Sequence, residues 1–216
     1  MKKTLTLVAA IVLAMAMLMM AGCGAIGETS GDVGNDEPTF VNPVADDPNY
    51  TTWELDDFSI SFPTEYIVNS AADADELDVS VDSSELAGTF NVLKESSAAM
   101  LITDIDDFDE DFVQQVCDEV VAEQSADLEE GMEITAKVGG IEKGTYGAKE
   151  GAKMNYTITV AYPEYDYSMD LDFCQIMVLD GVDLYVVSFA TYFDNGEGEA
   201  VDSVFGETVY PYIFCK

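Results

Sequence analysis

Apolar and polar residues alternate in several short segments in the first half of the chain. The clearest case is the segment 58–62, with the sequence Phe-Ser-Ile-Ser-Phe, which Pro63 follows directly. Alternation with a period of two places the three apolar side chains on one buried face of a strand and leaves the serines on a solvent face. The same pattern, or a short apolar run, predicts strands at Leu77 to Val81, Thr89 to Leu93 and Ala99 to Ile102.

The spacing of apolar residues changes between Phe108 and Leu128, where they recur at intervals of three and four. This spacing gathers them on one stripe of a helix. Acidic residues crowd the beginning of the segment, where carboxylates cap free amides and meet the positive end of the helix dipole. The stripe is formed by Phe112, Val113, Val116, Cys117, Val120 and Val121.

The chain after Gly131 is predicted to form a nearly continuous antiparallel sheet that ends in a short helix. Asp180-Gly181 lies between two long apolar segments and supplies the positive φ angles of a two-residue hairpin turn. A terminal amphipathic helix would bury Val201, Val204 and Phe205. The expected strands are Met132 to Val138, Ala152 to Tyr162, Tyr167 to Leu179 and Leu184 to Phe193.

The order of these elements predicts an α+β domain, with helices packed on a twisted antiparallel sheet. We expect this single domain to cover residues 53–216. The preceding segment, residues 24–52, is rich in Gly, Ser, Asp, Asn and Pro and has too few apolar residues to offset the entropy of ordering. Residues 23–52 are therefore expected to form a flexible tether.

Residues 1–22 have the layout of a secretory signal peptide. Lys2 and Lys3 form a basic start, an uncharged apolar run follows over residues 5–20, and the small residues Ala21 and Gly22 precede Cys23. The apolar run is shorter than the roughly 20 residues that a membrane-spanning helix needs. Cleavage after export is therefore favoured over a transmembrane anchor.

The sequence Met20-Ala21-Gly22-Cys23 resembles the lipobox of bacterial lipoproteins. In that group the cysteine thiol receives a diacylglyceryl group, with fatty acids such as palmitate, and becomes the new N-terminus. Leu is usual where Met20 stands, and Met is likewise apolar and unbranched at Cβ. The resemblance implies a protein anchored by lipid on Cys23 to the extracytoplasmic face of the cell membrane. The alternative is an ordinary secretory peptide in which Cys23 is incidental.

The charge of the chain limits its partners. The chain has 43 acidic residues and eight lysines, no arginine and no histidine, and a net charge of −35. Nucleic-acid binding needs clustered basic residues to neutralise phosphates, so nucleic acid is excluded as a partner. High acidity favours a cationic ligand or a positively charged patch on another envelope protein.

The composition also argues against most catalytic chemistry. Without histidine there is no Ser-His-Asp or Cys-His arrangement, and the scattered cysteines do not form a zinc motif. We expect no cofactor, no metal and no enzymatic activity. An aspartate run at the start of the predicted helix departs from a calcium-binding loop and is better explained by capping. The run comprises Asp104, Asp106, Asp107, Asp109 and Asp111.

Two features keep other functions open. Carboxylate pairs such as Glu164 with Asp166, or Asp170 with Asp172, have the side chains of a hydrolase acting on cell-envelope glycans, although such pairs are numerous in this chain. The aromatic residues Tyr162, Tyr165 and Tyr167 have the faces needed to stack on a sugar or to grip a cationic ligand. A structural role at the rim of a sheet is the competing interpretation of these tyrosines.

Three cysteines remain after Cys23, so they cannot all pair with one another. Export permits a disulfide, and the preferred pair is Cys174 with Cys215. Cys117 lies on the apolar stripe of the predicted helix, where a free thiol packs as a small hydrophobic group.

The opening strand that ends at Pro63, the long helix, the hairpin about Asp180-Gly181 and the helical end together resemble the Mog1/PsbP-like domains of bacterial lipoproteins. The resemblance covers about residues 53–216. It implies an α/β/α sandwich around a twisted antiparallel sheet, and a binding or assembly module instead of an enzyme.

Overall fold

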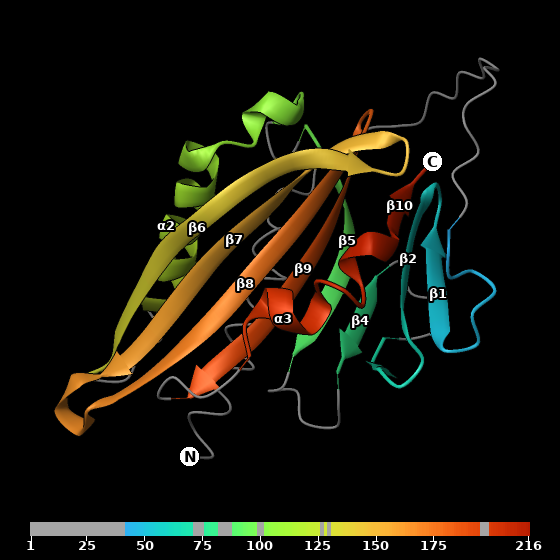
Figure 1. Ribbon diagram of the computed structural model, residues 1–216. Helices are drawn as coiled ribbons and strands as arrows, with labels where there is room; N and C mark the ends of the chain where they lie inside the picture. Colours follow the sequence, from blue (N-terminus) through green and yellow to red (C-terminus); the bar gives the residue numbers. More distant parts are fainter. Residues whose placement is uncertain are drawn as a thin grey trace.

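The computed structural model describes residues 42–70, 76–81, 88–98, 102–125, 128, 131–194 and 199–216. These residues form two antiparallel sheets, of seven strands in the order β3-β4-β5-β9-β8-β7-β6 and of three strands in the order β1-β2-β10 (Figure 1). The strands are β1 (Tyr50–Leu55), β2 (Phe58–Pro63), β3 (Ile67–Val68), β4 (Leu77–Ser80), β5 (Thr89–Ser96), β6 (Glu133–Tyr146), β7 (Lys149–Tyr162), β8 (Tyr167–Asp180), β9 (Asp183–Asp194) and β10 (Ile213–Cys215).

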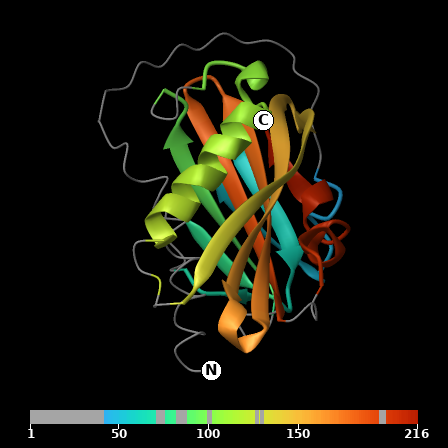
Figure 2. The same cartoon turned by 90° about the vertical axis from the view of Figure 1, so that its left-hand side faces the viewer.

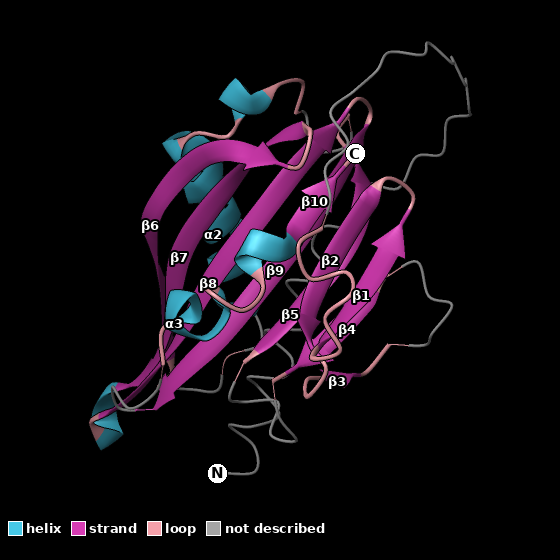
Figure 3. Ribbon diagram, turned by 45° about the vertical axis from the view of Figure 1, so that its right-hand side comes forward, coloured by secondary structure: helices cyan, strands magenta, loops and turns pink. Residues whose placement is uncertain are grey.

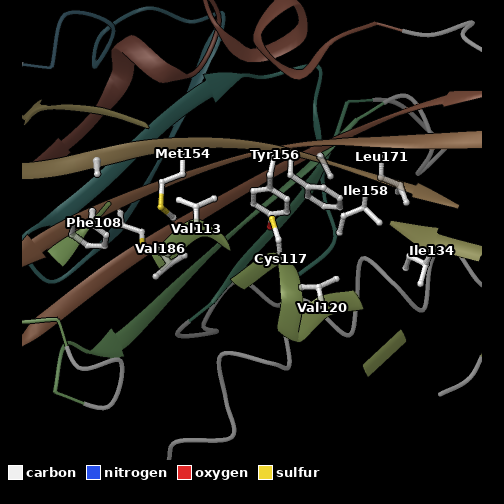
Figure 4. Packing of buried hydrophobic residues seen from close by; sticks show 14 of the residues in the cluster. Phe108, Val113, Cys117, Val120, Ile134, Met154, Tyr156, Ile158, Leu171 and Val186 are labelled. Atoms are coloured by element: carbon white, nitrogen blue, oxygen red, sulfur yellow. The ribbon is translucent and has the colours of Figure 1, made fainter. Parts of the chain in front are cut away.

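The helix α2 (Glu110–Ser125) covers one face of the large sheet and crosses it diagonally (Figure 2). Its apolar stripe packs mainly on β6 and to a lesser extent on β7, and Figure 4 shows Cys117 lying against Tyr156 of β7. Tyr156 in turn stacks on Phe173 of β8, with ring centroids 5.1 Å apart. The predicted helix and its buried stripe are confirmed, although Phe108 precedes α2 and packs in the same core.

The opposite face of the large sheet is covered mainly by the small sheet (Figure 3). Phe58 of β2 stacks on Tyr185 of β9 at 4.8 Å, and Phe62 meets Phe90 of β5 at 5.5 Å. The short helix α3 (Val201–Phe205) completes this layer and buries Val201 and Phe205, as the sequence predicts. Among the described residues, no helix is both long and apolar enough to cross a bilayer.

The α+β class and the antiparallel sheet are confirmed, but the expected α/β/α sandwich is wrong in its third layer. That layer is a sheet with only a five-residue helix beside it. The physical reason lies at the chain's end, where residues 213–215 form β10 and pair with β2. Together β1, β2 and β10 present enough apolar surface to close the core without a long second helix.

The segment 58–62 is a strand as predicted, yet its second face is not exposed to solvent. Ser59 and Ser61 are both buried. The Ser61 hydroxyl lies 2.7 Å from Thr52 Oγ1 and accepts a hydrogen bond from Asn42 Nδ2, also at 2.7 Å. Val44 is buried as well. Packing against the domain thus extends back to residue 42, and β1 begins at Tyr50, ahead of the expected boundary at residue 53.

Three long hairpins, β6–β7, β7–β8 and β8–β9, form the large sheet from β6 to β9, and β5, β4 and β3 continue it beyond β9. The expected hairpin near Asp180 is confirmed with a shift of one residue, because Asp180 pairs with Asp183 and the turn is Gly181-Val182. Gly181 has a φ of 63°, which suits the first central position of a type II′ turn. Residues 99–101 of a further predicted strand lie outside the described residues.

Candidate binding sites

The β7–β8 hairpin ends in a short projection that contains all three tyrosines singled out from the sequence. Tyr162 and Tyr167 face each other as the last pair of the β7–β8 ladder. Between them the 3-10 helix η3 (Pro163–Tyr165) begins at proline, whose fixed φ suits a first helical position. Asp166 then reverses the chain with a φ of 50°. We call residues 162–167 the tyrosine tip.

The three tyrosines differ in exposure. Tyr162 and Tyr167 are half-buried and pack against the core beneath α2. Tyr165 is 75% exposed, and its ring meets that of Tyr162 edge-on with centroids 6.0 Å apart. The tip therefore presents one exposed ring supported by a fixed second ring, on a projection formed by a hairpin.

The acidic residues at the tip are exposed. Glu164 and Asp166 flank Tyr165, and Glu133 begins β6 opposite Ala161 at the same end of the sheet. Among the described residues, none of the ion pairs involves these three carboxylates. The tip thus combines an exposed aromatic ring with uncompensated negative charge.

The carboxylates of Asp170 and Asp172 have structural partners. Asp170 accepts a hydrogen bond of 2.6 Å from Thr159 Oγ1 on β7. Asp172 accepts one from Thr157 Oγ1 at 3.3 Å and one from the backbone amide of Val201 at 3.0 Å. The second carboxylate therefore fixes the first turn of α3 on the sheet.

A polar cluster under α3 is a second candidate site. Lys153 Nζ lies 3.0 Å from Asp202 on α3 and 5.1 Å from the centre of the Tyr210 ring. Burial is the largest single influence on Lys153 and lowers its pKa, but the hydrogen bond to Asp202 and the nearby negative groups together outweigh it and raise the lysine pKa. Burial, followed by the nearby Cys174 thiol, raises the pKa of Tyr210 far above its usual range.

Two buried oxygens in this cluster, Asn155 Oδ1 and the Tyr210 hydroxyl, have no partner at hydrogen-bonding geometry within the described protein. An ordered water commonly satisfies such atoms. Lys153 and Asp202 already neutralise each other, and both hold α3 to β7. The cluster is therefore best explained as the polar clamp of α3. Its two charged partners lie 49 residues apart in the chain, so no local sequence pattern indicates the cluster.

The end of the large sheet opposite the tyrosine tip contains the other ion pairs that the described lysines make. Three lysines make ion pairs between elements there, and we call these residues and their partners the lysine end. Lys94 lies 2.7 Å from Asp56 and 2.9 Å from Asp183, Lys149 lies 2.9 Å from Asp180, and Lys143 lies 2.8 Å from Asp106. Here the acidic side chains are neutralised by the protein's own lysines.

Three members of the aspartate run, Asp104, Asp107 and Asp109, accept backbone hydrogen bonds at the turns that lead into α2. Asp104 accepts a hydrogen bond from the amide of Asp106, and Asp109 accepts one from the amide of Phe112. Asp107 accepts bonds from the amides of Thr103 and Asp104, which lower its pKa. Among the described residues, no group of three or more acidic or cysteine side chains is placed to hold a metal ion.

All three described cysteines are free, buried thiols. Cys117 lies on the buried face of α2 and packs in the core, as predicted. The expected Cys174–Cys215 disulfide is not formed, although both residues belong to the same apolar cluster. Cys174 lies on β8 and Cys215 on β10, in the two facing sheets. Facing sheets are separated by about 10 Å, more than the 7 Å or so that a disulfide tolerates between Cα atoms. Cys23 lies outside the described residues.

No protein-family model and no curated protein matches this chain. Among solved structures it is similar to cyanobacterial PsbP (CyanoP) from Synechocystis sp. PCC 6803, with 11% identity, a TM-score of 0.48, and coverage of 86% of this chain and 100% of that chain. It is also similar to the Ran-binding protein Mog1p of Saccharomyces cerevisiae, with 11% identity, a TM-score of 0.38, and coverage of 69% and 80%.

A third similar structure is PA94 from Pseudomonas aeruginosa, a protein of unknown function, with 13% identity, a TM-score of 0.30, and coverage of 66% of this chain and 83% of that chain. PsbP and Mog1p are the two proteins whose names the Mog1/PsbP-like group carries. Because all three TM-scores are low, any assignment of function rests on the residues of this chain alone.

Proposed function

We propose that this protein is a bacterial lipoprotein whose folded domain acts as a binding or assembly module at the extracytoplasmic face of the cell membrane. The observation that carries the proposal is the order of signals at the N-terminus. A basic start, an uncharged apolar run over residues 5–20 and two small residues lead directly to Cys23. Lipid on Cys23 would anchor a domain whose acidity keeps it away from an anionic bilayer surface.

The binding role is supported by how the described carboxylates are used. A glycan hydrolase needs two acids that converge on one bond, one of them kept protonated by its surroundings. Asp170 and Asp172 are instead held by threonine hydroxyls and by the first amide of α3, and Glu164 and Asp166 lie on the exposed tyrosine tip. These arrangements favour a binding module over the hydrolase.

The test compares the full-length protein with a Cys23→Ser variant in a bacterial host fed labelled palmitate. We expect the wild-type protein to carry the label, to sediment with membranes and to enter detergent. The serine variant should incorporate no label and lose its membrane association. Equal labelling and equal sedimentation of the two proteins would contradict lipidation at Cys23, and a soluble, unlabelled wild-type protein would contradict the anchor altogether.

A further inference from the structure

We propose that the tyrosine tip is a docking element for a lysine- or arginine-rich segment of another envelope protein. This inference rests on the proposed binding function and deepens it by assigning a surface and the chemistry of the partner. Four observations carry it: the exposed ring of Tyr165, the carboxylates beside it, their contrast with the other end of the sheet, and the position of the tip relative to β1.

The ring of Tyr165 is placed for a contact with a cation. It is 75% exposed at the end of a hairpin, and its edge-on contact with Tyr162 at 6.0 Å limits the positions it adopts. A lysine or arginine side chain over the face of an aromatic ring is attracted by the ring's quadrupole. Aromatic residues held by a firm base lose little conformational entropy on binding, which is one reason tyrosine is frequent in binding hot spots.

The carboxylates of Glu164 and Asp166 stand on either side of this ring. Both residues are exposed, and neither takes part in an ion pair among the described residues. The left-handed backbone of Asp166, with a φ of 50°, fixes the reversal of the chain next to the ring. A basic segment would therefore meet one aromatic face and two negative charges within one short turn, a complementary pattern for recognition.

A second exposed hairpin turn provides an internal contrast. Val182 of the β8–β9 turn is 74% exposed, so simple exposure does not distinguish it from Tyr165. Its neighbouring carboxylates, Asp180 and Asp183, are each paired with a lysine of the same molecule. The charges near Val182 are compensated by lysines of the same molecule, whereas none of the described lysines compensates those of the tyrosine tip.

The tip is also free of obstruction from the start of the described chain. Figures 1 and 3 both place the β7–β8 hairpin end on the opposite side of the molecule from β1. The segment that precedes β1 packs on β2, through the contacts of Asn42 and Val44. The described start of the chain therefore leaves the tip uncovered.

The test measures binding of a hexalysine peptide to the mature protein at physiological salt, by calorimetry and by amide chemical shifts. Tyr165→Ala should weaken binding about three- to fivefold, as expected for loss of an exposed cation–π contact, and Tyr165→Phe should preserve most of the affinity. The double variant Glu164→Gln, Asp166→Asn should weaken it by a similar factor, and Asn suits the left-handed position. The largest shifts should fall within residues 162–167.

The matched controls remove the same charge or exposure elsewhere. Glu54→Gln with Glu65→Gln takes two exposed carboxylates from other elements, and Val182→Ala trims the other exposed turn. We expect these controls to bind within about twofold of wild type. Equal weakening by both double variants would show that hexalysine binds through the overall negative charge of the protein and not through the tyrosine tip. Tyr165-dependent binding to phosphatidylcholine vesicles, without binding of hexalysine, would contradict a basic protein partner and show that the tip contacts a membrane.

Discussion

The two ends of the large sheet use acidic residues in opposite ways. At the lysine end, Asp56, Asp183, Asp180 and Asp106 are paired with lysines from other elements, and these pairs join segments that are distant in sequence or lie on neighbouring strands. At the tyrosine tip, exposed carboxylates surround an exposed ring and the described residues offer them no lysine.

This difference shows where a very acidic protein uses its few cations. Eight lysines face 43 acidic residues, so most carboxylates cannot have a lysine as partner. Lys94, Lys143, Lys149 and Lys153 all make ion pairs between elements. These four lysines therefore serve cohesion of the fold, and the carboxylates of the tip have no ion pair among the described residues. Changes at the two ends should consequently differ in their effect on stability.

Alkaline pH should have the largest effect on stability, because it ionises the buried cysteine thiols. One of these thiols, Cys215, lies on β10 next to the lysine end. Burial raises the pKa of Cys117 to about 11 and of Cys174 and Cys215 to about 12, against about 8.5 in an unfolded chain. Because the folded pKa values are raised, this stability is intact below about pH 8.5 and is lost as pH rises toward 11–12.

Between about pH 9 and 10 the three thiols ionise only in the unfolded chain, so the free energy of unfolding should fall by about 4 kcal/mol per pH unit. Above about pH 10 the loss should steepen, because burial also raises the pKa of tyrosines such as Tyr156 and Tyr185. Urea denaturation at several pH values above about 8.5 measures the slope. Cys215→Ala should reduce it by about a third, since one of the three groups is removed. A slope that is the same in the variant, or no fall in stability on the alkaline side, would show that these thiols ionise equally in both states.

Among single substitutions, Gly147→Ala should cause the largest loss of stability. Gly147 has a φ of 70° in the β6–β7 turn, and an added Cβ would lie against the carbonyl oxygen of Cys215. Strain and overpacking together should cost about 2–4 kcal/mol in thermal or urea unfolding. Gly144→Ala in the same hairpin has open space around its Cβ and should stay within about 0.5 kcal/mol. Similar losses of stability in both variants would show that the close approach of residue 147 to the Cys215 carbonyl is not the cause.

Lys94→Met should destabilise the protein by about 1 kcal/mol. The substitution removes two ion pairs of a partly exposed lysine and leaves Asp56 and Asp183 near each other without compensation. Lys137→Met is the control, because Lys137 is exposed and takes part in no ion pair among the described residues. The difference between the two variants should shrink as salt is raised. A difference that persists in high salt would point to packing as its cause.

Substitutions at the tyrosine tip should have the smallest effect on stability. Glu164→Gln with Asp166→Asn should change the free energy of unfolding by about 0.5 kcal/mol or less, in the stabilising direction, because it relieves self-repulsion in a chain of charge −35. Tyr165→Ala should be similarly mild, since the side chain is 75% exposed. A loss above about 1 kcal/mol in either variant would assign the tip a structural role.

Local periodicity is sufficient to predict much of this fold. The stripe that includes Val113, Cys117 and Val120 becomes the buried face of α2, and the Asp-Gly signal marks the β8–β9 turn to within one residue. Each of these features depends on neighbours within a few positions. The tyrosines of the tip are likewise identified by their proximity in sequence.

The features that the sequence does not predict depend on contacts between segments that are distant in the chain. The strand β10 is three residues long and exists because β2, from the start of the domain, accepts it as a partner. Burial of Ser59 and Ser61 and the ion pair of Lys153 with Asp202 also depend on long-range packing. In the same way, the sequence indicates which tyrosines lie close together but not that Tyr165 is the exposed one of the three.

The most direct test of the contrast between the two ends is site-specific photocrosslinking in living cells. A photoreactive residue replaces Tyr165 in one strain and Val182 in another, at comparable expression. We predict that the Tyr165 position yields a discrete adduct whose crosslinked peptide is rich in lysine or arginine, while the Val182 position yields little. An adduct from Val182 with none from Tyr165, or crosslinks from Tyr165 to neutral or acidic segments, would contradict the assignment of the tyrosine tip as the docking element for a basic partner.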